Sequence, residues 1–212
     1  MMRLQKATSA AIIALIYIFL SRLLGTFFPE FFQDLTVAKI NTLLILLSYT
    51  GLLFFSICFL MDYVQPRQND LKNGAIILTI AISIITILQI KNVISVFLSY
   101  RYAFLAQRFL IEPIAAWVAT VMSLVFLIIF YRHYTNGKKL KNAIGLAIAG
   151  SAIGLIPRTL TSLQDITRQN LSSLQDYNIF ILTFGFFLIA FSFYTSIKFL
   201  LVFYEQQLAK DK

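Results

Sequence analysis

Long apolar runs separated by short charged segments restrict most strongly how this chain can fold. A helix needs about 20 apolar residues to cross a hydrocarbon core of ~30 Å. The sequence holds six runs of this kind, at residues 9–28, 40–64, 74–97, 113–134, 140–156 and 177–204. They lack the alternation of membrane β-strands. Because backbone amides in lipid must be paired internally, we predict an all-α bundle of about six transmembrane helices in one domain, residues 1–212.

Composition and charge agree with lipid as the main solvent of these side chains. Hydrophobic residues make up 59% of the 212 residues and charged residues 13%, against roughly 45–50% and 25% in soluble proteins. The net charge of +9 lies at the ends of the apolar runs and forms no nucleic-acid-binding motif. We therefore expect the lipid bilayer and its anionic phospholipids as partners, and no nucleic acid.

The basic residues also predict the direction of insertion. With the N-terminus in the cytoplasm, eleven Lys and Arg residues fall on the cytoplasmic side and seven on the other, which together make the 18 of the chain. The densest group, Arg132, Lys138, Lys139 and Lys141, surrounds the turn between the fourth and fifth runs. Because cytoplasmic loops carry the excess of positive charge, we expect both termini in the cytoplasm and the chain in the plasma (inner) membrane.

Two outer connections are too long for simple turns and have amphipathic patterns. In residues 93–111 apolar side chains recur at helical spacing, while Arg101 and Arg108 share another face. Residues 159–176 contain the motif Leu-Thr/Ser-Ser-Leu-Gln-Asp twice, eleven residues apart. We predict an amphipathic outer-side helix near each segment, the first either extending the third span or lying on the interface. Pro157, just beyond the fifth run, indicates a helix restart.

Small residues form one face of the fifth run. Ala143, Ala147, Gly150 and Gly154 recur at intervals of three or four residues, and the two glycines make a GxxxG pair. Small residues let helix backbones approach closely, and van der Waals contact then holds the helices together in lipid. This face predicts either close packing inside one bundle, the favoured interpretation, or an interface between subunits.

Hydroxyl and amide side chains form one face of the third run. Thr79, Ser83, Thr86 and Gln89 follow each other at offsets of four, three and three residues. Such a face could line a hydrophilic path. Hydrogen bonding between helices, at ~0.6–2 kcal/mol per contact, or to the helix's own backbone, explains the same residues and is the favoured interpretation.

Arginines are numerous on the predicted outer side. Arg22, Arg101, Arg108 and Arg158 lie near the outer ends of the predicted helices. The guanidinium fork matches phosphate and carboxylate geometry, so one hypothesis is that this rim binds an anionic group. Ion pairing with neighbouring carboxylates at the interface is the favoured interpretation.

The sequence offers little for catalysis. The chain has one His and one Cys, so it can form neither a bis-histidine haem site nor a cysteine metal cluster by itself. It contains no GxSxG, P-loop or dinucleotide-binding fingerprint. We therefore assign no catalytic residue, no metal site and no cofactor, and favour a non-enzymatic protein.

Three classes of function remain. The first choice is a non-enzymatic multi-pass protein that acts through helix–helix contacts, as a homo-oligomer or as a subunit of a membrane complex. The second is a channel or transporter for a small solute, an anion included, with the polar face of residues 79–89 along its path. The third is a membrane enzyme or sensor that handles lipid-linked anionic ligands at the outer face.

Overall fold

The computed structural model describes residues 2–64, 69–98, 111–134, 137–167 and 175–210. A 3₁₀ turn, Pro29–Phe32, follows the first helix, and a π-helical turn, Phe59–Tyr63, continues the second. The six long helices are α1 (Met2–Phe27), α2 (Leu35–Cys58), α3 (Asn69–Leu98), α4 (Ile111–His133), α5 (Lys138–Thr167) and α6 (Gln175–Lys210).

Six of these helical stretches are long and apolar enough to cross a membrane. This confirms the predicted all-α bundle with six spans. The stretches are Arg3–Phe27, Leu35–Tyr63, Asn69–Leu98, Ile114–His133, Lys138–Pro157 and Phe184–Ala209.

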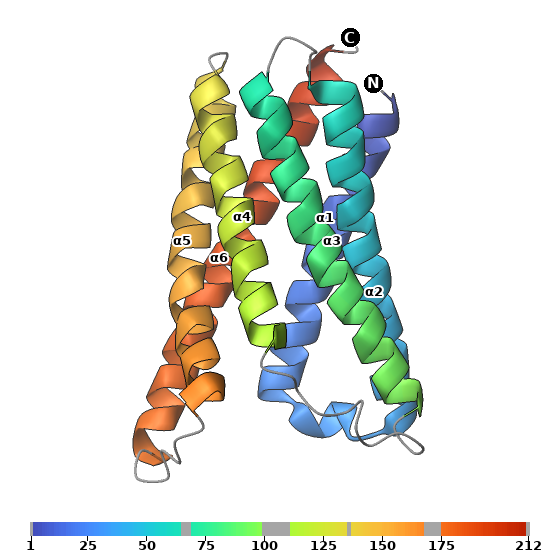
Figure 1. The fold of residues 1–212 in the computed structure, drawn as a ribbon, viewed down its shortest axis with the longest axis vertical. Helices are drawn as coiled ribbons and strands as arrows, with labels where there is room; N and C mark the ends of the chain where they lie inside the picture. Colours follow the sequence, from blue (N-terminus) through green and yellow to red (C-terminus); the bar gives the residue numbers. More distant parts are fainter. Residues whose placement is uncertain (1, 65–68, 99–110, 135–136, 168–174, 211–212) are drawn as a thin grey trace.

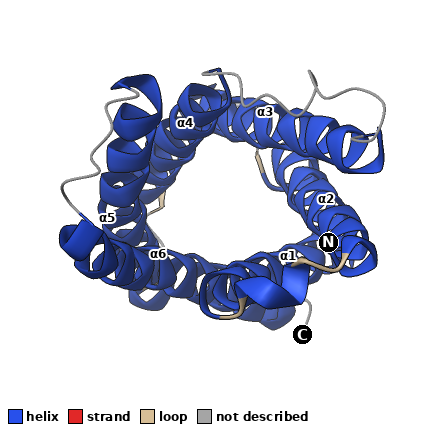
Figure 2. Cartoon of the chain, turned by 90° about the horizontal axis from the view of Figure 1, so that it is seen from below, coloured by secondary structure: helices blue, strands red, loops and turns tan. Residues whose placement is uncertain are grey.

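The helices stand side by side in an up-and-down ring. Each helix packs against its neighbour in the sequence, and α6 packs back against α1, so the order around the ring follows the chain (Figure 2). Both termini lie at the same end, the upper one in Figure 1, which we call the terminal end. The connection from α1 to α2 lies at the opposite end, which we call the far end (Figure 1).

Two spanning helices extend into the connections predicted to be amphipathic. Residues 93–98 are the last turns of α3 and residues 159–167 continue α5, while 99–110 and 168–174 lie outside the described residues. The restart expected at Pro157 is wrong, because α5 runs through it. Proline removes one backbone donor, and membrane helices tolerate this loss. Gly185 of α6 lies beside the ring, and a Cβ there would make an ordinary contact of 3.5 Å with the Pro157 Cβ.

Among the described side chains, the hydrophobic core cluster lies in the half of the bundle near the terminal end. Its members come from every helix, from Leu4 near the N-terminus to Phe203 near the C-terminus. In the far half, none of the residues in 35–47, 87–98 and 184–194, all of them described, is buried. The helices therefore share a common core near the terminal end and pack more loosely toward the far end.

Large apolar side chains cover the outside of the ring. Ile13, Leu47, Ile87 and Phe187 are each 64 to 67% exposed, and they come from four different helices. An apolar surface of this extent would be unstable in water. It suits a protein whose surroundings are hydrocarbon.

Asp34 caps the start of α2, and its replacement tests this local structure. Its Oδ1 accepts hydrogen bonds from the backbone N–H groups of Thr36 (2.7 Å) and Val37 (3.1 Å), and these bonds lower the pKa of the exposed carboxyl. We expect Asp34→Ala to speed hydrogen exchange at both amides several-fold, because two donors lose their acceptor. Asp34→Asn should preserve most of the protection of these amides against exchange. Gln33→Ala, the control, should preserve all of it.

The same cap predicts a pH dependence. Since the folded-state pKa of Asp34 lies below that of an unfolded aspartate, the cap contributes fully above the unfolded value and is lost as the pH falls through the folded value. Exchange at Thr36 and Val37, corrected for its intrinsic pH dependence, should rise over that acidic range in the wild type. Asp34→Asn should remove this rise, and an identical profile in both proteins would contradict the cap.

Candidate functional site

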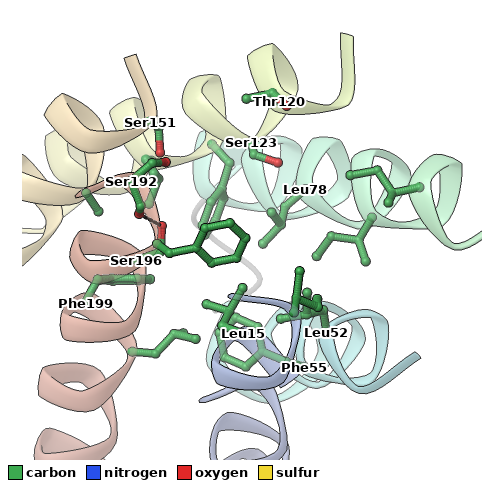
Figure 3. Close-up of a pocket in the computed structure, with 18 of the residues that line it drawn as sticks. Leu15, Leu52, Phe55, Leu78, Thr120, Ser123, Ser151, Ser192, Ser196 and Phe199 are labelled. Atoms are coloured by element: carbon green, nitrogen blue, oxygen red, sulfur yellow. Dashed lines mark hydrogen bonds between the residues drawn. The ribbon is translucent and has the colours of Figure 1, made fainter. Parts of the chain in front are cut away.

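A cavity of about 220 Å³ lies inside the ring, at the depth where the common core ends. All six helices contribute to its lining (Figure 3). The wall formed by α1, α2 and α3 is almost entirely apolar, and Tyr49 is its one residue with a polar group. The apolar members of this wall are Leu15, Ile18, Leu52, Phe55, Leu78, Ile82 and Ile85.

The opposite wall carries hydroxyl groups from α4, α5 and α6. Its hydroxyl-bearing residues are Thr120, Ser123, Ser151, Ser192 and Ser196. Three of them donate to a carbonyl four residues earlier in their own helix, at 2.9 Å in each case. A hydroxyl that donates in this way can still accept a hydrogen bond from a ligand.

Ser151 and Ser192 differ from these three in their hydrogen bonding. Within the part of the chain that the structure describes, neither side-chain hydroxyl has a hydrogen-bond partner, and neither belongs to the fully buried unpaired groups. Both hydroxyls can therefore donate to a molecule in the cavity as well as accept from it.

The residues that line the cavity carry no charge. A charged group placed there would be desolvated without a partner, which is costly. The wall from α4 to α6, which we call the hydroxyl wall, also contains Phe126, Leu127, Ala147, Phe193, Phe199 and Leu200. A mainly apolar cavity with hydroxyl groups on one side fits an uncharged amphipathic molecule whose polar group lies against α4 to α6.

Packed aromatic rings close the cavity on the side of the terminal end. Phe59 stands at their centre, and its ring centroid lies 4.8 Å from Tyr63, 5.4 Å from Phe130 and 5.5 Å from Phe126. We call these rings the aromatic cluster. It consists of Phe55, Phe59, Tyr63, Phe126, Phe130, Tyr134, Phe199 and Phe203.

Polar contacts join the helix ends beyond the aromatic cluster. Tyr134, directly after α4, donates from its Oη to Gln206 Oε1 of α6 at 2.7 Å. Gln207 Nε2 donates to Thr8 Oγ1 of α1 at 3.2 Å. An exposed ion pair joins Lys139 to a carboxylate of α6. The terminal side of the cavity is therefore closed by rings and by hydrogen-bonded helix ends.

Toward the far end, contacts between helices are pairwise. Tyr17 and Ser21 of α1 donate to Asn41 Oδ1 of α2 at 2.9 and 2.8 Å. Trp117 Nε1 of α4 donates to Thr159 Oγ1 of α5 at 2.9 Å. Among the side chains that the structure describes, the hydrophobic core cluster lies on the terminal side of the cavity, and fewer buried residues lie on its far side.

The polar face predicted on α3 does not line the cavity. The α3 residues that do line it are Leu78, Ile82 and Ile85. Thr79 and Thr86 donate to the carbonyls of Ala75 and Ile82, at 2.9 and 2.8 Å. The side chain of Gln89 accepts from Asn92 at 3.3 Å. Ser83 is half-buried.

The small-residue face of α5 lies against α6. Ala143, Ala147, Gly150 and Gly154 are all buried. A Cβ at Gly150 would lie 2.9 Å from Thr195 Cβ, and a Cβ at Gly154 would lie 2.9 Å from Ser192 Cβ. Real Cβ atoms do not approach so closely, so the two glycines permit the short distance between α5 and α6.

Little of the predicted arginine rim falls on described side chains. Arg22 is exposed near the far end of α1. Arg101 and Arg108 lie outside the described residues, and Arg158 lies in α5 with a side chain that is not described. The rim remains a hypothesis from the sequence.

The hydroxyl wall was missed because its residues form no long polar face. Thr120 and Ser123 are three residues apart, Ser192 and Ser196 are four apart, and Ser151 is the one serine or threonine of the apolar run 140–156. The signal present in the sequence is that short hydroxyl pairs occur in two apolar runs. Nothing in the sequence indicates that these pairs face the same space.

No protein-family model, curated protein or solved structure matches this chain. Function has to be argued from the geometry of the cavity and the helices around it.

Proposed function

We propose that this multi-pass membrane protein is a carrier that binds a small, uncharged amphipathic molecule in the central cavity. The observation that carries the proposal is a cavity that all six helices line and that the buried core bounds on the side of the terminal end. Carriers bind near the middle of the membrane and expose the site to one side at a time. With both termini in the cytoplasm, this conformation has its closed half inside and its loosely packed half outside.

Two features favour a carrier over the other classes. A channel needs a continuous path, and the aromatic cluster stands across any path along the ring axis. The two glycines of the small-residue face, for which a subunit interface was the alternative interpretation, pack against α6 of the same chain. An anionic solute would find no counter-charge among the lining residues. A homo-oligomer or a larger complex remains compatible with the carrier but does not explain the cavity.

Photolabelling of the protein in lipid nanodiscs tests this function. The probe is hexadecanol carrying a diazirine and an alkyne, and peptide mapping locates the label. We expect it on peptides of α4 and α6, with competition by plain hexadecanol. The corresponding hexadecyl-trimethylammonium probe should label these peptides at least tenfold less, because its charge has no partner in the cavity.

Filling the cavity should abolish the labelling. Ser123→Leu combined with Ser151→Leu adds bulk and removes two hydroxyls from the polar wall, and we expect at least a tenfold loss of label. Thr50→Leu is the matched control, because Thr50 also bonds its own helix but is exposed on α2. Undiminished labelling of a folded double variant would contradict the carrier, as would equal labelling by both probes.

A further inference from the structure

The contact between α1 and α6 is the one place where the ring closes between helices that no loop connects. At the terminal end, Gln207 Nε2 of α6 donates to Thr8 Oγ1 of α1 at 3.2 Å, and both residues are buried. This end of the contact is fixed by a buried polar pair. The part of the contact toward the far end is made by aromatic rings instead.

Phenylalanine rings make the α1–α6 contact in the far half. The Phe19 centroid of α1 lies 5.6 Å from Phe193 and 6.5 Å from Phe186 of α6, and Phe27 lies 5.0 Å from Phe186. Such contacts break no hydrogen bond when a ring changes rotamer. Toward the same end, α1 and α2 are instead joined through Asn41 by two hydrogen bonds.

Phe193 belongs to both the α1–α6 contact and the lining of the cavity. On the same helix, Phe187 and Phe191 are 65 and 40% exposed and so face the surrounding hydrocarbon. A swing of the Phe19 and Phe193 rings would therefore connect the cavity directly with the acyl chains outside the ring.

We propose that the α1–α6 contact is a lateral gate through which an uncharged long-chain amphiphile, such as a fatty alcohol or a monoacylglycerol, enters from the bilayer. The substrate is then a membrane-dissolved molecule whose neutral head meets the hydroxyl groups of α4 to α6 and whose first carbons fill the cavity of about 220 Å³, while the rest of its chain extends toward the far end. This inference rests on the proposed carrier function, and it adds the substrate class and the route of entry.

The test locks the contact in the full-length protein in nanodiscs. In a cysteine-free Cys58→Ala background, Phe19→Cys and Phe193→Cys are joined by a short bis-methanethiosulfonate reagent, and the diazirine hexadecanol is then added with the lipid. We expect the rate of labelling on α4 and α6 to fall at least tenfold. Adding the reagent after the probe has equilibrated should instead retain the label, because the cavity itself is intact.

Two controls separate the gate from general effects. The same double variant without reagent should label at least as fast as the wild type, because removing the two rings opens the contact, and the effect of the cross-link is measured against this rate. Cross-linking Thr8→Cys to Gln207→Cys joins the same helices at the end that is already fixed, and should leave entry unchanged.

The outcomes distinguish the two proposals. If the 19–193 cross-link leaves labelling unchanged while Ser123→Leu with Ser151→Leu still blocks it, the lateral gate is wrong and the carrier stands. If the cavity peptides of the wild type do not label at all, the carrier is wrong and the gate with it.

Discussion

Phe59→Ala should strongly destabilise the protein. Phe59 is 0% exposed and its ring packs against five others of the aromatic cluster. In soluble proteins such a truncation costs roughly 3–5 kcal/mol. In lipid the helices of the unfolded state are also in an apolar solvent, so little hydrophobic free energy is lost. The main cost is the void left by the ring and its lost van der Waals contacts. We expect about 2–3 kcal/mol in SDS titrations of mixed micelles.

Phe54→Ala is the matched control for this prediction. Phe54 lies on the same helix, but 41% of it is exposed on the outer surface. Its removal takes away lipid contacts that the solvent can replace, so we expect stability close to that of the wild type. Equal losses for the two variants would show that the aromatic cluster does not hold the terminal half together.

Cys58 reports on the same cluster from within the native chain. It is 0% exposed and adjacent to Phe59, so a polar maleimide should react with it slowly in the folded wild type. Phe59→Ala leaves a gap beside it, and we expect reaction to be at least tenfold faster at temperatures where the variant is still folded. No change in rate would mean that the remaining rings close the gap.

Gly150→Ala should destabilise the α5–α6 pair. The added methyl would lie 2.9 Å from Thr195 Cβ and would also overlap Thr195 Oγ1. The hydroxyl can rotate away, but Thr195 Cβ is fixed to the backbone, so the helices must separate. Overpacking of this kind costs about 1–3 kcal/mol. Gly154→Ala should behave in the same way, because it meets Ser192 Cβ at the same distance.

Gly145→Ala provides a control with the opposite sign. A Cβ at Gly145 would meet Tyr131 Cε2 at 3.7 Å, which is an ordinary contact. Alanine stabilises a helix interior by roughly 0.5–1 kcal/mol relative to glycine, so this variant should be at least as stable as the wild type. Adding Thr195→Gly to Gly150→Ala should recover most of the stability that Gly150→Ala loses. Failure of this exchange to recover stability would show that the close approach is not the cause.

The number and type of the helices could be predicted from local sequence. Hydropathy over about 20 residues identifies a span, because each backbone amide in lipid needs a partner within its own segment. The ends of the helices were predicted less accurately. α5 continues through Pro157, because a membrane helix tolerates one missing backbone donor.

The residues that line the cavity could not be predicted in the same way. Thr79 of α3 and Ser123 of α4 both donate to the carbonyl four residues earlier, yet only Ser123 faces the cavity. Which hydroxyl turns inward depends on the rotation of each helix, and packing against its neighbours sets that rotation. Phenylalanines pose the same problem, since Phe54 and Phe59 belong to one apolar run and only Phe59 is buried.

The sequence by itself determined that the chain is a helical membrane protein, where its spans run, and that close packing was available at Gly150 and Gly154. Only the tertiary structure decided which side chains meet at the centre of the ring, that α6 covers the two glycines, and that α1 and α6 close the ring through aromatic contacts. The physical reason is that lipid is as apolar as the interior of the bundle. Hydropathy therefore separates membrane from water, but it cannot separate the inside of a membrane protein from its outside.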